Sequence, residues 1–60
     1  MLNTKDPYLL LSIVNMKLRD EASSLEDLCK SYDQSIEEVR ERLKKVGYVY
    51  NNSLNQFIAE

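Results

Sequence analysis

The stretch Leu28–Leu43, which reads LCKSYDQSIEEVRERL, has the spacing of a helix-turn-helix. The small residue Cys29 is followed at the fourth position by Asp33, a residue type that tolerates positive φ, and then by Ser35, a good helix N-cap. Val39 supplies the branched apolar residue expected on the second helix. The pattern predicts two helices joined by a tight turn, with Asp33 in the left-handed region of backbone conformation.

The flanking residues extend this pattern to a whole domain. Asp6 and Pro7 are typical of a helix start, Ser24 can cap a second helix, and Gly47 can end the third. After Gly47, aromatic and branched residues surround a run of turn formers, which predicts a β-hairpin. The expected fold class is mainly α: a three-helix, helix-turn-helix-like domain with a C-terminal two-stranded β-hairpin as a small wing. The predicted ranges are 7–20, 25–32 and 36–46 for the helices and 48–58 for the hairpin, within a single domain of residues 1–60.

The length of the chain makes its stability marginal. A chain of 60 residues buries a small fraction of its surface, so a metal ion, a disulfide or oligomerisation is commonly needed to stabilise it. With no histidine and one cysteine, the chain can form neither an internal disulfide nor a cysteine/histidine zinc site. Oligomerisation remains, which predicts a homodimer. The lone thiol, with no signal peptide and no apolar membrane span, predicts a cytoplasmic protein without a membrane partner.

The first predicted helix has an apolar arc of roughly 220°, interrupted by Lys17, which is too wide for one contact surface. The broader part of the arc is expected to pack on the second and third helices: Leu10, Leu11, Val14 and Leu18. A second stripe remains about a third of a turn away and is the candidate oligomer interface: Leu9, Ile13 and Met16. In the alternative arrangement the aromatic face of the hairpin covers this stripe without a partner subunit: Tyr48, Tyr50 and Phe57.

Catalysis and metal binding are not expected. Cys29 is predicted to be buried where two helices cross, away from the cations that would activate a thiol. Adjacent acidic pairs at 20–21, 26–27 and 37–38 could offer oxygen ligands to a divalent cation. The last two pairs are expected in the first turns of helices, where negative charge already complements the helix dipole. We therefore predict a protein that is not an enzyme and has no catalytic residues, no metal site, no cofactor and no small-molecule substrate.

The charges of the third helix disfavour the function that a helix-turn-helix suggests. Its N-terminal end, which would approach DNA, carries Glu37 and Glu38, and no charged side chain occurs from Val46 to Ala59 in the hairpin. The leading interpretation is a non-enzymatic protein-interaction module that pairs with itself as a homodimer; the sequence does not specify any other protein partner. The alternative is a DNA-binding transcriptional regulator, which would use a separate set of polar residues: Gln34, Ser35, Arg40, Lys44 and Lys45.

Three blocks of the chain resemble a known family. The blocks are DPYLLLSIVNMKLRDE, SLEDLCKSYD and ERLKKVGYVYNNSLNQF, and they cover nearly the whole sequence. They are similar to the small bacterial proteins of domain-of-unknown-function family 4250. The resemblance implies a bacterial origin. It implies no catalytic or binding residue, because the function of that family is uncharacterised.

Overall fold

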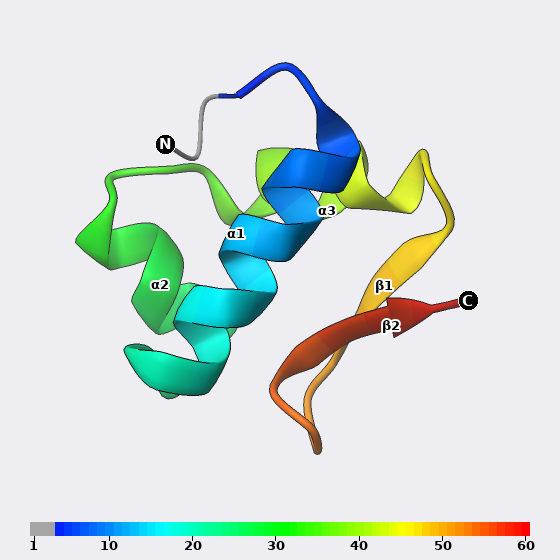
Figure 1. The fold of residues 1–60 in the computed structure, drawn as a ribbon. Helices are drawn as coiled ribbons and strands as arrows, with labels where there is room; N and C mark the ends of the chain where they lie inside the picture. Colours follow the sequence, from blue (N-terminus) through cyan, green and yellow to red (C-terminus); the bar gives the residue numbers. More distant parts are fainter. Residues whose placement is uncertain (1–3) are drawn as a thin grey trace.

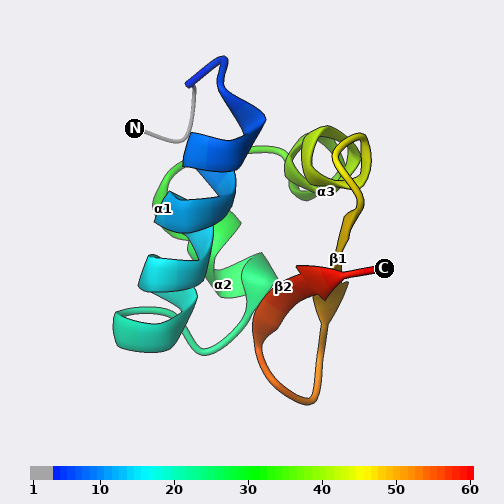
Figure 2. The same cartoon turned by 45° about the vertical axis from the view of Figure 1, so that its right-hand side comes forward.

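The computed structural model describes residues 4–60, and within them the chain forms three helices followed by a two-stranded antiparallel sheet (Figures 1 and 2). The elements are α1 (Pro7–Asp20), α2 (Leu25–Ser31), α3 (Ile36–Lys44), β1 (Tyr48–Asn51) and β2 (Gln56–Ala59). Helix α1 runs through the middle of the molecule and contacts α2, α3 and β2 (Figure 1). The predicted fold class, mainly α with a C-terminal hairpin, is confirmed; residues 1–3 of the predicted domain lie outside the described residues.

Each helix begins at the cap that the sequence predicts. The Asp6 carboxylate accepts hydrogen bonds from the backbone N–H groups of Tyr8 and Leu9, at 2.9 and 3.3 Å. The hydroxyls of Ser24 and Ser35 each accept a hydrogen bond from the N–H group three residues later, at 3.0 and 3.3 Å. These bonds satisfy donors that a helix cannot pair internally, so the starts of all three helices follow from local sequence.

The turn after α2 has the geometry of a Schellman motif. Asp33 has a φ of 54°, and its N–H donates to the carbonyl of Lys30, while the N–H of Gln34 donates to the carbonyl of Cys29 at 2.8 Å. The predicted left-handed conformation of Asp33 is confirmed. Because this motif closes the helix, α2 ends at Ser31, one residue before the predicted end.

Two substitutions of Asp33 should show how much its positive φ affects the free energy of unfolding. Glycine adopts positive φ without strain, so Asp33→Gly should leave the free energy of unfolding unchanged or raise it. Asp33→Val should lower it by about 1 kcal/mol or more, because a β-branched side chain is strained in the left-handed region. Urea unfolding midpoints of the two variants make the comparison. Equal stability of the valine and glycine variants would contradict this role of the turn.

The third helix ends earlier than predicted. Helix α3 ends at Lys44 rather than at residue 46, because the N–H groups of Val46 and Gly47 bond to carbonyls three residues earlier, at 3.2 and 2.9 Å. Such bonds tighten the last turn into a 3₁₀ geometry. Gly47 then takes a φ of 86° and directs the chain into β1. The hairpin continues to Ala59, one residue beyond its predicted end.

The aromatic face of the hairpin lies on the helical core. In the antiparallel pairing Tyr50 is opposite Phe57, and their rings are 5.5 Å apart at a tilt of 54°. Phe57 is buried, and Tyr48 and Tyr50 are partly buried against the same cluster. The other buried apolar residues come from the three helices: Leu10, Val14, Leu18, Leu25, Leu28, Cys29, Val39 and Leu43. Leu11, which was also predicted to face the helices, is partly buried against this core.

Candidate functional site

The predicted oligomer stripe on α1 is largely at the surface. The side chains of Leu9 and Met16 are 49% and 44% exposed. Ile13, the third predicted member, is partly buried and packs against the core. The structure therefore divides the stripe, leaving Leu9 and Met16 available for a contact while Ile13 contributes to the fold of the single chain.

The hairpin does not cover this stripe, because hydrogen bonds attach the hairpin to a different side of α1. The Asn15 side chain donates to the carbonyl of Phe57 at 3.1 Å and accepts from the N–H of Phe57 at 2.8 Å. The Gln56 side chain adds a hydrogen bond to the main-chain carbonyl of Asn15 at 3.1 Å. Asn15 is separated from Met16 by the 100° turn between successive helical residues, so a hairpin held at Asn15 does not lie over the stripe.

Two exposed apolar residues were missed by the sequence interpretation. Tyr8, in the first turn of α1, is 59% exposed, and Leu54, at the tip of the hairpin, is 62% exposed. Leu54 is an apolar residue in a run of turn formers, and this contrast is a signal that could have identified it. Tyr8 is separated from Leu9 by the 100° turn between successive helical residues, and Leu54 belongs to the hairpin turn, so neither residue is part of the stripe.

Two of the residues proposed for the nucleic-acid alternative are engaged within the fold. The Ser35 hydroxyl caps α3 and donates to the Glu37 carboxylate at 3.3 Å. Gln34 is partly buried, and its side-chain nitrogen lies 3.5 Å from the Tyr32 carbonyl. Their polar groups are therefore used to build the turn and the start of α3.

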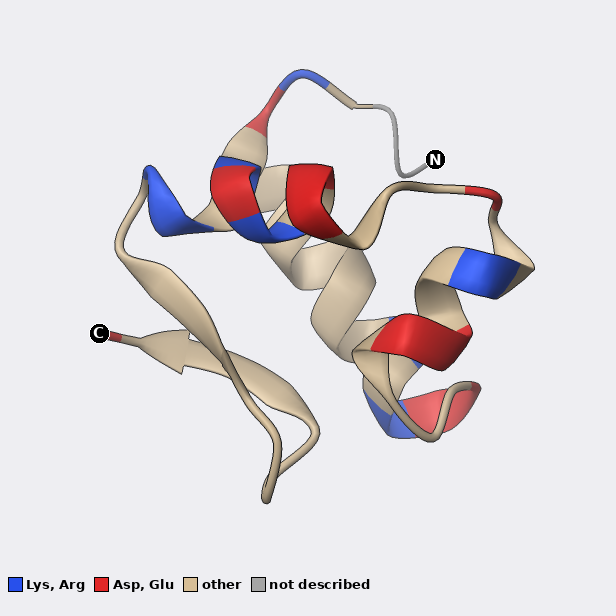
Figure 3. Ribbon diagram, turned by 180° about the vertical axis from the view of Figure 1, so that it is seen from behind, with Lys and Arg blue, Asp and Glu red and all other residues tan. Residues whose placement is uncertain are grey.

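The three basic candidates do not form one patch. Arg40 and Lys44 lie on one face of α3, in a recess that Glu37 and Glu41 also line. Lys45 lines a different recess, together with Lys5, Pro7 and Arg42 near the start of α1. Charges of both signs alternate along α3, whereas both strands are uncharged (Figure 3). Within residues 4–60, these basic side chains are divided between two recesses and are interspersed with carboxylates, which does not favour contact with a phosphate backbone.

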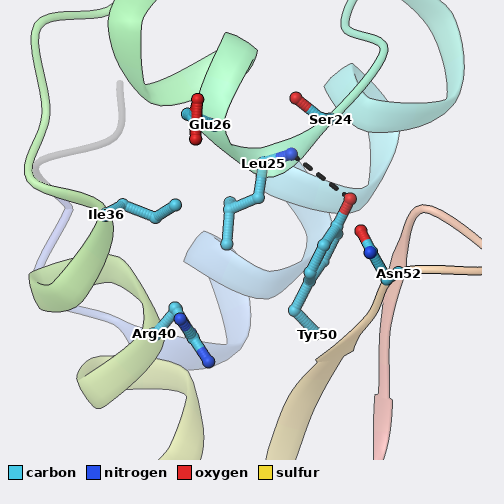
Figure 4. Close-up of a pocket in the computed structure, with 7 residues that line it drawn as sticks. All are labelled: Ser24, Leu25, Glu26, Ile36, Arg40, Tyr50 and Asn52. Atoms are coloured by element: carbon cyan, nitrogen blue, oxygen red, sulfur yellow. Dashed lines mark hydrogen bonds between the residues drawn. The ribbon is translucent and has the colours of Figure 1, made fainter.

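Two adjoining pockets beside α3 and β1 share Arg40 and Tyr50, and we call them together the β1–α3 groove. One part has a volume of about 440 Å³ and is shown in Figure 4, with these lining residues: Ser24, Leu25, Glu26, Ile36, Arg40, Tyr50 and Asn52. A second part of about 170 Å³ shares Arg40 and Tyr50 and adds these residues: Lys44, Tyr48, Val49, Phe57 and Glu60. The Tyr50 hydroxyl accepts a hydrogen bond from the N–H of Leu25 at 3.3 Å and donates one to the side-chain oxygen of Asn55 at 2.6 Å.

Cys29 lacks the surroundings of a reactive thiol. It is 4% exposed, and burial raises the pKa of its thiol, with a further rise from the negative charge of Glu37. A higher pKa lowers the population of the nucleophilic thiolate. Within residues 4–60, no group of three or more His, Cys, Asp or Glu side chains is placed to hold a metal ion. None of the helices in the described part of the chain is long and apolar enough to cross a membrane.

Lys17 is a buried cation that the sequence indicates only as an interruption of the apolar arc. It is 5% exposed, and its ammonium lies 3.2 Å from the Glu21 carboxylate and 5.0 Å from the centre of the Tyr32 ring. Interactions with Tyr32, and then with Glu21, raise the pKa of Lys17 above its ordinary value. The aliphatic part of Lys17 covers apolar surface of the core, while its ammonium group stays paired with Glu21 and Tyr32.

The chain matches one protein family over nearly its whole length. The model described as Domain of unknown function (DUF4250) matches residues 4–57. The chain belongs to this family. No curated protein and no solved structure matches it. The range matched to DUF4250 includes Leu9 and Met16 on α1 and Arg40 in the β1–α3 groove, whereas Glu60, which lines the second part of the groove, lies outside it.

Proposed function

We propose that the protein is a small, non-enzymatic interaction module that acts as a homodimer. The observation that carries this proposal is the exposure of Leu9 and Met16 on α1, on a side of the helix that the hairpin leaves open. A two-fold contact between two α1 helices would bury both residues of each copy, because the same apolar stripe of each subunit forms the interface. The dimer would add apolar burial to a core formed by only 60 residues.

The scaffold of the module is proposed to be of helix-turn-helix type. Support comes from the Schellman turn at Asp33, which joins α2 to α3 within four residues, and from the contacts of both helices with α1. We also propose a cytoplasmic location. A cysteine that is buried and reduced as a packing residue suits a reducing compartment.

The homodimer is tested by substitutions confined to exposed positions of α1. Sedimentation equilibrium of the wild type at tens of micromolar should give a dimer. Met16→Lys and Leu9→Lys should each weaken the dimer at least about tenfold, because each puts a charge into an apolar contact. Lysine is a good helix former, so circular dichroism of both variants should show an intact fold. Ile13 is avoided because it packs on the core.

The matched control is Ser53→Lys, which adds the same charge at an exposed position of the hairpin turn. This variant should remain as dimeric as the wild type. A wild type that is monomeric at tens of micromolar would contradict the proposal. So would equal weakening by the control, since the effect would then come from net charge.

Binding to duplex DNA should be weak and indifferent to sequence. The N-terminal end of α3 presents Glu37 and Glu38, the strands carry no charge, and Lys45 is separated from Arg40. A protein that contacts many phosphates loses affinity steeply as salt rises, whereas one with incidental contacts hardly binds. Fluorescence anisotropy with random and genomic duplexes at low and moderate salt measures this. Submicromolar, sequence-selective binding at physiological salt would favour the DNA-binding alternative.

A further inference from the structure

The pairing of the hairpin determines which main-chain groups point outward. The N–H of Glu60 donates to the carbonyl of Gly47 at 2.8 Å, so these two residues form a hydrogen-bonded pair. Bonded and non-bonded pairs alternate in an antiparallel ladder. The pairs Tyr48–Ala59 and Tyr50–Phe57 are therefore non-bonded, and their N–H and carbonyl groups point away from the opposite strand.

The two outer edges of the hairpin differ in their hydrogen bonding. The edge of β2 is closed, because the Asn15 side chain pairs with both the N–H and the carbonyl of Phe57, as a neighbouring strand would. On β1, the outward N–H and carbonyl groups of Tyr48 and Tyr50 have no hydrogen-bond partner among residues 4–60. Exposed edges are commonly protected by a charged residue or proline, and β1 reads YVYN.

The open edge borders the β1–α3 groove. The two parts of the groove meet at Arg40, which reaches from α3 into the space beside β1 (Figure 4). Lys44 lies one turn further along α3, and neither cation forms an ion pair within the described residues. Glu26 lines the first part and Glu60 the second, and Glu37 and Glu41 line the neighbouring recess that Arg40 and Lys44 also border. The groove therefore combines unpaired strand groups with one cation, Arg40, that both of its parts share.

We propose that the β1–α3 groove is a docking site for an extended segment of a partner protein, which adds a strand to β1 and places an Asp or Glu side chain on Arg40. The main chain of the segment would pair with Tyr48 and Tyr50, and alternate side chains would enter the groove. Four residues of β1 extend over about 13 Å, which accommodates a segment of about four residues in the extended conformation. Ile36 and Leu25 line the groove beyond Arg40 and favour an apolar side chain there.

A second copy of the chain fits this site less well. Its β1 strand carries no carboxylate for Arg40, and a two-fold pairing of β1 strands would bring the two Arg40 side chains, and the two Lys44 side chains, toward one another. The inference rests on the protein-binding function proposed above, but it does not depend on the α1 dimer, which uses Leu9 and Met16.

The test begins with a phage-displayed library of random decapeptides selected on the wild-type protein. The selected peptides should share an acidic position flanked by apolar or β-branched residues. When a synthetic selected peptide is added to ¹⁵N-labelled protein, hydrogen exchange of the Tyr48 and Tyr50 amides should slow at least about tenfold, because a paired amide is protected. The amide of Val49, which already pairs with β2, serves as the internal reference.

Charge exchange then tests the contact with Arg40. Arg40→Glu should weaken binding of the selected peptide at least about tenfold, and a peptide with Arg or Lys at the acidic position should regain affinity for this variant. Lys30→Glu, an equal charge change at an exposed position of α2, should leave binding unchanged. Circular dichroism would confirm that both variants are folded.

Several results would overturn the proposal. The first is a selection that returns no peptide above background, and the second is a peptide that binds Arg40→Glu and the wild type equally. Protection of the β1 amides on self-association alone would show that a second copy occupies the edge. Met16→Lys separates the two surfaces, because it should abolish the dimer without changing peptide binding. Loss of both would place the peptide on α1 and overturn the groove as its site.

Discussion

Asn55→Ala should lower the free energy of unfolding by about 3 kcal/mol. This is a large share of the total, because a chain this short typically has a free energy of unfolding of about 3–9 kcal/mol. The Asn55 amide donates to the carbonyls of Leu18 and Ala22, at 3.0 and 3.1 Å, and its oxygen accepts from the Tyr50 hydroxyl at 2.6 Å. Each such bond contributes about 1 kcal/mol. Asn55 also has a φ of 52°, a conformation that asparagine tolerates better than alanine.

Two further variants divide this effect into its parts. Asn55→Gly loses the same hydrogen bonds but relieves the backbone, so it should be more stable than Asn55→Ala. Asn55→Asp keeps an acceptor for Tyr50 but turns a carboxylate toward the carbonyls of Leu18 and Ala22, so it should resemble the alanine variant. Urea unfolding followed by far-ultraviolet circular dichroism gives the three values. A change below about 0.5 kcal/mol for Asn55→Ala, which is typical of an uninvolved surface residue, would contradict this role.

Asn15→Leu should lower the free energy of unfolding by about 2–4 kcal/mol. The substitution leaves the N–H and carbonyl of Phe57 without their partner, in a partly buried position, and each unpaired group costs about 1–3 kcal/mol. Leucine is a better helix former than asparagine, so a loss of stability cannot come from helix propensity. Faster exchange of the Phe57 amide would show that the β2 edge has opened.

The control for Asn15 is aspartate. Asn15→Asp keeps the acceptor for the N–H of Phe57 and loses the donor to its carbonyl, so its unfolding free energy should lie between those of the leucine variant and the wild type. Equal stability of all three proteins would mean that the hairpin is held to α1 by apolar packing alone. In that case the edge of β2 would be as open as that of β1.

The features that could be predicted from sequence are those decided by neighbours in the chain. Asp6, Ser24 and Ser35 cap helices through bonds to residues two or three positions away, and the spacing from Cys29 to Ser35 left only Asp33 to reverse the chain. Such bonds need no knowledge of the remaining fold. The end of α3 was predicted less well, because the sequence does not distinguish a last α-helical turn from a 3₁₀ turn before Gly47.

The attachment of the hairpin could not be predicted, because it depends on contacts between distant residues. Asn15 bonds to Phe57 across 42 positions, and Asn55 bonds to Leu18 across 37. In the sequence, Asn55 is one of several turn formers and Asn15 is one polar residue on the outer side of a helix. Lys17 was likewise identified only as an interruption, since its burial depends on Glu21 and Tyr32 lying together around it.

The candidate surfaces were predicted in part. A helical wheel is sufficient to place Leu9 and Met16 on a stripe separate from the core. It does not show that Ile13, which lies between this stripe and the core-facing residues, packs inward. Their closeness in sequence suggests that Arg40 and Lys45, two of the candidate nucleic-acid contacts, share one surface. The structure separates them, with Arg40 beside β1 and Lys45 beside Lys5.

The central claim, a two-fold contact through α1, is tested most directly by detecting contacts between copies. A mixture of ¹³C-labelled and unlabelled protein, studied by isotope-filtered nuclear Overhauser spectroscopy, reports only on protons of different chains. We predict intermolecular signals between the methyl groups of Leu9 and Met16 and their counterparts, and their loss in Met16→Lys. A dimer whose intermolecular signals arise from Tyr48, Val49 and Tyr50 instead, with none from α1, would contradict the claim.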